Sequence, residues 1–322
     1  MRRVFSRRPQ LKSVLTIAAL LLAVFGSMCL YSESYASVYN ITNLLSQLIP
    51  LSILAIAQTL VILSGGIDLS LGSMISLTTV LAGKLMDTDS PLQIAFALLA
   101  IFGAMGLCGF LNGAGSNFLR VPPLITTLCM STVLNGVALL IMPVAGGGVN
   151  KAFSRFVVQK WDILSMPVVI LAIVYAMIHY VLYRTRTGTH IYAIGRSRAI
   201  SKSMGVAVKS VSIRVYAMAA LLAAVAGILL ASRMRIGDPL TGANYAMDSI
   251  TAAAIGGTAL SGGVGLISGS VAGAFLVGML ANAMNMIGVD QFYQYVVKGS
   301  LLVVAMIIYS LSGISEVKRR GR

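Results

Sequence analysis

The chain has 322 residues, of which 57% are hydrophobic and only 10% are charged, whereas an ordinary soluble domain carries about 25% charged residues. So few charges exclude a soluble globular enzyme, and the high apolar content excludes a disordered chain. The net charge of +15 requires either an acidic partner such as nucleic acid or a fixed side of a membrane.

Ten apolar segments approach the length of about 20 residues that a membrane-spanning helix needs. In chain order they cover residues 13–31, 44–64, 69–86, 92–112, 122–142, 165–183, 215–232, 247–262, 265–287 and 292–312. The eighth of them is short and interrupted by glycine. We therefore expect an all-α polytopic membrane protein, with one membrane domain over 13–312 between tails of residues 1–12 and 313–322.

The first segment also resembles a signal peptide, because Arg2 and Arg3 precede it. Nine further spans follow, so an uncleaved first span is the preferred interpretation. When the N-terminus is placed in the cytoplasm, most Lys and Arg residues lie on that side, including those of the tail 1–12 and of the connection 184–214. The positive-inside rule then predicts that both termini are cytoplasmic. It also accounts for the net charge, so nucleic-acid binding is not expected.

A Leu-Ser-Gly-Gly motif occurs twice, at residues 63–66 and 260–263. In ATP-binding-cassette ATPases this motif continues with Gln and holds a nucleotide phosphate, but Ile67 and Val264 follow it here. The sequence also lacks a Gly-x4-Gly-Lys-Ser/Thr phosphate loop, so it predicts neither ATP hydrolysis nor another enzymatic activity. The glycines instead favour breaks between helices, which occur at membrane depth only where protein or water satisfies the backbone.

The sequence therefore predicts a set of turn residues around these motifs. They are Gly65, Gly66, Asp68, Gly256, Gly257, Gly262 and Gly263. Asp68 is a candidate helix cap, and a proton relay is the alternative that the scarcity of carboxylates in the spans disfavours. The stretch 63–73 recurs loosely at 255–263, which indicates either an internal duplication or a chance match of two Gly-rich turns. Gly269 and Gly273, four residues apart, predict close helix packing.

Several amide side chains lie within the predicted spans. They are Gln58, Asn112, Asn135, Asn282 and Asn285. An unpaired amide in hydrocarbon costs several kcal/mol, so each should face protein or a polar route. Because amides both donate and accept hydrogen bonds, they are candidates for lining a path for a hydroxylated solute. Contacts between helices are the equally favoured alternative. The two histidines have no partners at metal-ligand spacing, so no metal site is expected.

The connection 184–214 contains a pattern typical of a short amphipathic helix. Between Gly195 and Gly205 there is room for about two helical turns. Ile200 and Met204 are four residues apart and would form an apolar knob. Arg198 and Lys202 have the same spacing on a neighbouring face. Such a helix suits a groove on a cytoplasmic partner, and the alternative is a helix that lies on anionic lipid.

Four stretches together resemble one known family. They are Gly-Gly-Ile-Asp-Leu-Ser at 65–70, Ala193 to Val206, Ile255 to Gly263, and Gly288 to Gln294. In this order they are similar to the permease subunits of ribose/galactose-type bacterial ABC importers, over residues 40–312. The resemblance implies an all-helical inner-membrane permease of about ten spans. It also implies a second permease copy or paralogue, two cytoplasmic ATPases that bind ATP and Mg²⁺, and a periplasmic sugar-binding protein.

In that family the stretch 193–206 forms the helix that couples to the ATPase. The resemblance carries this role to Gly195, Arg196, Arg198, Ile200, Ser201, Lys202, Met204 and Gly205. Arg198 stands where the family commonly has an acidic residue. No cofactor is expected on this chain itself.

The preferred hypothesis is therefore the membrane subunit of an ATP-driven importer of a sugar or a similar polar solute. The alternative is a self-sufficient secondary sugar transporter coupled to H⁺ or Na⁺, which the few carboxylates in the spans disfavour. A membrane subunit that transports nothing is a third possibility, and the amides and broken helices weigh against it.

Overall fold

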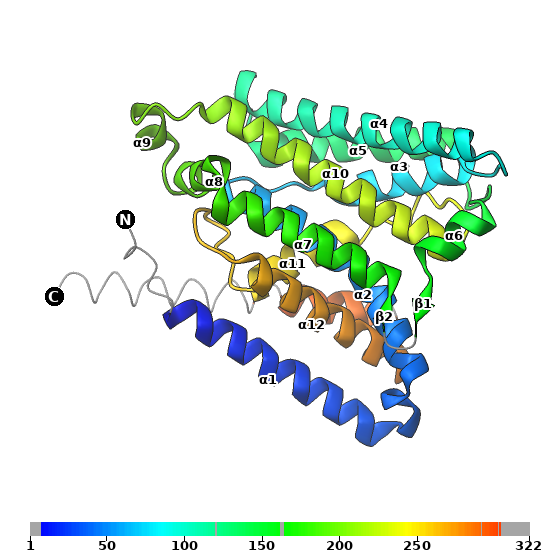
Figure 1. Cartoon of the computed structure of the whole chain (residues 1–322). Helices are drawn as coiled ribbons and strands as arrows, with labels where there is room; N and C mark the ends of the chain where they lie inside the picture. Colours follow the sequence, from blue (N-terminus) through cyan, green and yellow to red (C-terminus); the bar gives the residue numbers. More distant parts are fainter. Residues whose placement is uncertain (1–7, 120, 162–163, 291, 302, 304–322) are drawn as a thin grey trace.

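The computed structural model describes residues 8–119, 121–161, 164–290, 292–301 and 303 (Figure 1). Residues 1–7 of the first predicted tail, the whole second tail 313–322, residues 302 and 304–312 of the last predicted span, and Arg120 lie outside the described residues. All the long elements of the described residues are helices, and one hairpin of two-residue strands precedes α7.

The helices are α1 (Arg8–Tyr31), η1 (Glu33–Ala36), α2 (Val38–Leu63), α3 (Ser70–Leu85), α4 (Pro91–Phe118), α5 (Pro123–Ile141), α6 (Lys151–Val157), α7 (Met166–Arg184), α8 (Arg186–Arg196), α9 (Arg198–Ser203), α10 (Val208–Met234), α11 (Tyr245–Ile255) and α12 (Ile267–Met286). The strands are β1 (Lys160–Trp161) and β2 (Leu164–Ser165), paired antiparallel. The chain is helical again over residues 292–301.

Among the described residues, six helices are long and apolar enough to cross a membrane, which confirms the all-α polytopic class. They are α2, α4, α5, α7, α10 and α12. The helices α3 and α11, with 16 and 11 residues, extend about 24 Å and 16 Å at 1.5 Å per residue, less than the roughly 30 Å of a bilayer core. The total of ten spans stays a prediction.

The eighth predicted span, residues 247–262, is corrected by the structure. Its helix, α11, ends at Ile255 and Gly256 caps it. Residues 257–266 form an irregular loop before α12 begins at Ile267. The apolar composition of this stretch was compatible with a span, but its glycines end the helix early.

The core is built around α2 and α10. They are the two most buried of the six long apolar helices, since 83% and 78% of the residues in their most apolar stretches are buried. Glycine allows the backbones to approach closely: a Cβ atom at Gly109 of α4 would lie 2.6 Å from the carbonyl oxygen of Tyr216 in α10. Between α11 and α12, a Cβ at Gly269 would collide with the Gly256 backbone and one at Gly273 with the Ala252 carbonyl. The packing that the Gly269 and Gly273 spacing predicts is therefore present.

One extended segment, residues 64–69, enters the bundle from the end that carries α8 and α9. It follows α2 and leads to α3. Its Asp68 contacts Asn112 of α4, which lies one and a half turns before the last residue of α4, or about 9 Å inward at 1.5 Å per residue. This segment therefore reaches well below the end of the bundle.

A second non-helical segment, residues 235–244, enters from the opposite end and contains several turns. At its start, the Gly146 amide donates to the Gly237 carbonyl at 2.9 Å, and Gly237 packs beside Gly83 near the end of α3. At its inner end Gly242 packs against Gly72 at the start of α3, and the distance along α3 between these contacts is about 16 Å.

The two segments place the starts of α3 and α11 side by side inside the bundle. A Cβ at Gly72 would lie 3.1 Å from the backbone nitrogen of Ala246, and the Gly242 amide donates to Ser76 Oγ at 3.0 Å. From this meeting point the two short helices run to opposite ends of the molecule. This is the arrangement of an inverted pair of broken helices, which recurs in membrane transporters.

Candidate coupling site

The two Gly-rich breaks of the sequence meet beneath α8, at the left end of the molecule in Figure 1. The Gly263 amide donates to the Leu63 carbonyl at 3.1 Å. Gly195 of α8 lies against both, because a Cβ there would be 2.5 Å from the Gly263 nitrogen and would collide with the Leu63 oxygen. A Cβ at Gly262 would lie 2.9 Å from Gly65 Cα. We call these five residues the glycine junction.

Two side chains of α8 and its last turn reinforce the glycine junction. Tyr192 Oη donates to the Gly265 carbonyl at 3.0 Å, and Arg196 Nε donates to the Gly263 carbonyl at 3.4 Å. Burial raises the pKa of the Tyr192 hydroxyl above its usual range, so this hydroxyl stays protonated and able to donate. A displacement of α8 therefore acts on the end of α2 and on the loop before α12 together.

The two breaks share a helix-ending geometry. After α2, the Gly65 amide donates to Ile62 at 2.8 Å and the Gly66 amide to Val61 at 3.1 Å. After α11, the Gly257 amide donates to Ala254 and the Thr258 amide to Ala253, both at 3.0 Å. Gly65 and Gly257 have φ values of 81° and 83°, which glycine adopts without a Cβ penalty. Both ends are thus Schellman caps, which explains why the two stretches look alike in sequence.

The short helix predicted from Gly195 to Gly205 begins later than expected. Gly195 and Arg196 are the last residues of α8 rather than part of it. Ser197 is extended and its Oγ accepts from the Ile200 amide at 3.3 Å, which caps the start of α9. At the other end the Gly205 amide donates to the Lys202 carbonyl at 3.0 Å with φ at 81°. The helix α9 is therefore a short element capped at both ends.

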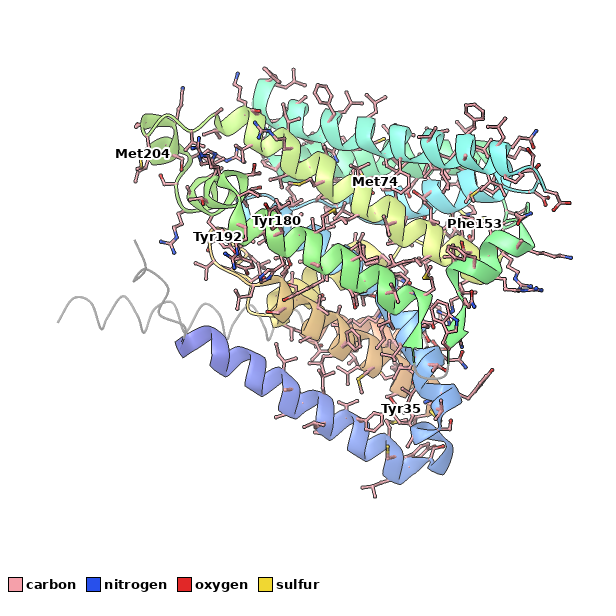
Figure 2. All side chains as sticks on the ribbon, viewed as in Figure 1. Tyr35, Met74, Phe153, Tyr180, Tyr192 and Met204 are labelled. Carbon is pink, nitrogen blue, oxygen red and sulfur yellow. The ribbon has the colours of Figure 1, made fainter. Side chains whose placement is uncertain are left out.

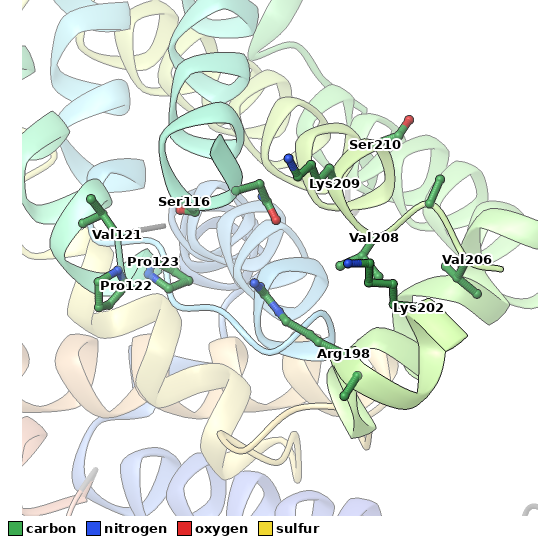
Figure 3. Close-up of a pocket in the computed structure, with 13 residues that line it drawn as sticks. Ser116, Val121, Pro122, Pro123, Arg198, Lys202, Val206, Val208, Lys209 and Ser210 are labelled. Carbon is green, nitrogen blue, oxygen red and sulfur yellow. The ribbon is translucent and has the colours of Figure 1, made fainter. Parts of the chain in front are cut away.

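The faces of α9 differ in chemistry. Ile200 and Met204 are 64% and 78% exposed, and Met204 lies at the far end of the molecule beyond α8 (Figure 2). Ser201 is buried. Arg198 and Lys202 line a groove beneath the ends of α4 and α5 (Figure 3). We call Ile200 and Met204 the apolar tip of α9. Exposed apolar side chains of this kind are typical of surfaces that bind a partner.

Two of the five amides surround the buried Asp68. Asn112 Nδ2 donates to Ser70 Oγ at 2.8 Å and to Asp68 Oδ2 at 3.4 Å. Asp68 Oδ1 also accepts from the Ser70 amide at 2.8 Å and from Ser70 Oγ at 2.6 Å. Gln58, in the amide orientation that satisfies both of its polar atoms, pairs with the Asp68 backbone at 3.0 and 3.2 Å. Asp68 therefore caps the start of α3 inside a polar cluster.

The other three amides lie apart from this cluster. Asn135 is exposed on α5. Asn285 is exposed near the end of α12 and accepts from Gln294 Nε2 at 2.7 Å. Asn282 is half-buried, and its Oδ1 is buried with no hydrogen-bond partner among the described residues. No hydrogen bond between described residues joins these three to Gln58 or Asn112.

The sequence analysis missed the non-helical segment 235–244 and its Asp238. Asp238 Oδ1 accepts from the Leu240 amide at 2.9 Å, as Asp68 accepts from Ser70. The available signal was spacing: Asp238 precedes Gly242 by four residues, as Asp68 precedes Gly72. It also missed the ion pair of Lys298 with Asp248, whose Nζ–Oδ2 distance is 2.8 Å. Within the described ranges, no three His, Cys, Asp or Glu side chains gather to hold a metal.

Comparison with known proteins gives consistent matches. A family model described as the permease component of branched-chain amino acid transport systems matches residues 40–306. The ribose import permease RbsC of Escherichia coli K12 is 34% identical over 314 residues, 95% of this chain and 96% of that protein. RbsC of Bacillus subtilis is 35% identical over 282 residues, 86% of each chain. No solved structure matches.

A further relative is named for a different solute. The autoinducer 2 import permease LsrD of Yersinia pseudotuberculosis is 32% identical over 308 residues, 92% of this chain and 91% of that protein. Together with the six apolar helices, the matches identify a multi-pass protein of the bacterial inner membrane. They span almost the whole chain and include both breaks, α8 and α9. This chain therefore belongs to the family of ABC-importer permease components that includes the ribose and autoinducer 2 import permeases.

Proposed function

We propose that this chain is the membrane subunit of an ATP-driven importer for a sugar or a similar polar solute. It would pair with a second permease, either another copy or a paralogue, and receive its solute from a periplasmic binding protein. Two separate ATPase domains would bind ATP and Mg²⁺ on the cytoplasmic side. The names of the relatives support the solute class, since RbsC imports ribose and LsrD imports autoinducer 2.

The observation that carries the coupling role is the connection of α9 to both breaks. The apolar tip, Ile200 and Met204, is free to enter a groove of an ATPase. From there α9 continues directly into α8, and Gly195 of α8 contacts Leu63 and Gly263. Movement of the ATPase would therefore reach α2 and α12 through backbone contacts, and the open side of the solute path would switch.

We propose that the five amides of the predicted spans have different roles and do not all line one solute path. Gln58 and Asn112 hold the extended segment 64–69 in place through Asp68. Asn112 and Asn282 each have a buried side-chain oxygen that accepts no hydrogen bond among the described residues. Because Asn112 is already held by Ser70 and Asp68, Asn282 is the amide better suited to a solute hydroxyl. Asn135 and Asn285 remain candidates on exposed helix surfaces, which a second permease would convert into walls of a shared path.

A double substitution tests the coupling role. We expect Ile200→Asp with Met204→Asp to abolish co-purification of the ATPase with the full chain, because two desolvated carboxylates oppose an apolar contact. Ser203→Asp with Thr189→Asp adds the same charge at exposed positions of the same end and should leave co-purification intact. Equal loss in both variants would assign the effect to charge alone and contradict the role of the tip.

A reconstitution separates this function from a secondary transporter. Vesicles that contain the permease, its ATPase and its binding protein should accumulate the solute only with ATP. If vesicles that contain the chain alone accumulated sugar in response to an H⁺ or Na⁺ gradient, the proposal would be wrong.

A further inference from the structure

A groove of about 840 Å³ lies between α9, the start of α10 and the connection between α4 and α5 (Figure 3). Its lining combines three cationic side chains, a few small polar groups and an apolar wall. The lining residues on which the argument depends are Arg198, Lys202, Lys209, Val121, Pro122 and Val208. We call this the basic groove.

The described lining of the basic groove carries positive charge without an acidic side chain. None of the described residues that line it is an Asp or a Glu. Arg198 extends from α9 toward the side that Ser116 and Pro123 form (Figure 3), and its Nη2 is buried with no hydrogen-bond partner among the described residues. A buried guanidinium nitrogen without an acceptor is costly. The groove is therefore suited to an anionic ligand.

Two more features favour a phosphate group as that anion. The helix α10 begins at the groove, where Ala207 provides no side-chain cap and the Val208 amide donates to the Val206 carbonyl at 2.8 Å, so the positive end of the helix dipole adds to the charge of the groove. Lys209 Nζ lies 4.5 Å above the ring of Phe118, which fixes that ammonium group at the rim of the groove.

The apolar wall and the location indicate which phosphate. The groove lies where α4 ends and where α5 and α10 begin. With α9 in the cytoplasm, this end of the apolar helices would face the headgroups of the inner leaflet. Phe118 and Leu119 beside it are 59% and 74% exposed and offer a surface for acyl chains. The apolar tip of α9 is exposed outside the groove and is left to the ATPase. We propose that the basic groove binds the headgroup phosphate of an anionic phospholipid of the inner leaflet.

This inference rests on the proposed orientation, with α9 in the cytoplasm, but not on the transported solute. Basic pockets between helices on that side are suited to anionic headgroups. A bound lipid would join α9 to the ends of α4, α5 and α10. It would thereby restrict where the coupling helix can sit before the ATPase arrives.

Native mass spectrometry of the full chain in detergent tests the proposal. We titrate phosphatidylglycerol and, separately, phosphatidylcholine with the same acyl chains. We expect phosphatidylglycerol to bind at least tenfold more tightly. Arg198→Gln with Lys209→Gln should weaken phosphatidylglycerol binding about thirtyfold, and Lys209→Gln alone about fivefold. The single variant changes one exposed side chain, so it serves if the double variant unfolds.

The matched control is Arg184→Gln with Arg186→Gln, which removes two exposed charges from the same end of the chain and should leave binding unchanged. Equal weakening by control and groove variants would overturn the proposal, as would equal affinity for the two lipids. Glycerol 3-phosphate at the same concentration should not displace the lipid, and displacement would indicate a site for small anions. A cross-link from Lys209 to an acidic residue of the ATPase would assign the groove to that protein instead.

Discussion

The structure leaves no room for a side chain at Gly195. Its missing side chain lets the α8 backbone touch the Leu63 carbonyl and the Gly263 amide at the same point. Any Cβ at this position must push α8 away from one break or from both. By contrast, a Cβ at Gly136 of α5 meets no atom within 4 Å, so the two glycines give a matched pair.

We expect Gly195→Ala to leave the chain inserted and to lower uptake at least tenfold, because α8 would lose its backbone contact with the breaks. Overpacking of this kind costs about 1–3 kcal/mol of stability. ATP-driven uptake in reconstituted vesicles and thermal unfolding in detergent measure the two effects. Gly136→Ala should change neither quantity, and normal uptake by Gly195→Ala would contradict the role of this contact.

The carboxylates of Asp68 and Asp238 each accept a hydrogen bond from the backbone amide two residues later, but they differ in burial. Asp68 is fully buried and accepts from three donors on two residues, whereas Asp238 is half-buried. We expect Asp68→Ala to lower the free energy of unfolding by about 2–3 kcal/mol, since buried donors lose their acceptor. Asp238→Ala should cost less than half as much. Chemical denaturation of both variants in detergent measures the difference, and equal costs would refute the argument from burial.

At the scale of elements, the short helices α3 and α11 depend on each other. Each begins inside the bundle, and their first turns touch at Gly72, Gly242 and Ala246. Neither could cross a bilayer alone. Their stability therefore comes from packing, of α3 on α10 and α5 and of α11 on α12 and α2, rather than from insertion as independent spans.

We expect Gly72→Ala to separate these first turns and to destabilise the fold by about 1–3 kcal/mol. Its Cβ would lie 2.5 Å from the Gly242 carbonyl oxygen, which is backbone and cannot rotate away. Gly103→Ala in α4, where no atom lies within 4 Å, is the control. A melting temperature for Gly72→Ala equal to that of the control would show that the two helices do not depend on this contact.

The elements that the sequence predicted well are those with long apolar runs. Residues 44–64 and 215–232 were recognised because α2 and α10 are apolar on nearly every face. The break after α2 was found through Gly65 and Gly66. The start of α9 was misplaced by three residues, because a single extended Ser197 interrupts an otherwise continuous helical pattern. Such an interruption depends on how α8 packs and leaves little trace in composition.

The candidate site was predictable by parts but not as an assembly. The sequence analysis predicted Gly262 and Gly263 as turn residues and Gly195 as part of the coupling helix. It did not predict their contact with Leu63, because contacts between residues so far apart in the chain are set by tertiary packing. The amides illustrate the converse. All five were candidates for one path, and the structure places Gln58 and Asn112 around Asp68 and the others elsewhere.

At the scale of the whole molecule, both the coupling role of α9 and the lipid site of the basic groove require that α9 lies in the cytoplasm. The exposed lysines and arginines of 184–214 gather at the end with α8 and α9, while α6 lies at the opposite end (Figure 1). We expect Ser203→Cys to react with an impermeant thiol reagent only after cells are opened, and Lys151→Cys to react in intact cells. Both substitutions are made in a variant without Cys29, Cys108 and Cys129. The reverse pattern would invert the proposed topology.

The closest contacts of the glycine junction join main chain to main chain, and the charged side chain that hydrogen-bonds to it, Arg196, does not titrate near neutral pH. Neutral amide and carbonyl groups respond weakly to ionic strength and do not titrate near neutral pH. Transmission from α8 to the two broken helices should thus work equally well across the salt and acidity that a bacterium meets. Sensitivity to such conditions would have to enter at the cationic surfaces around α9.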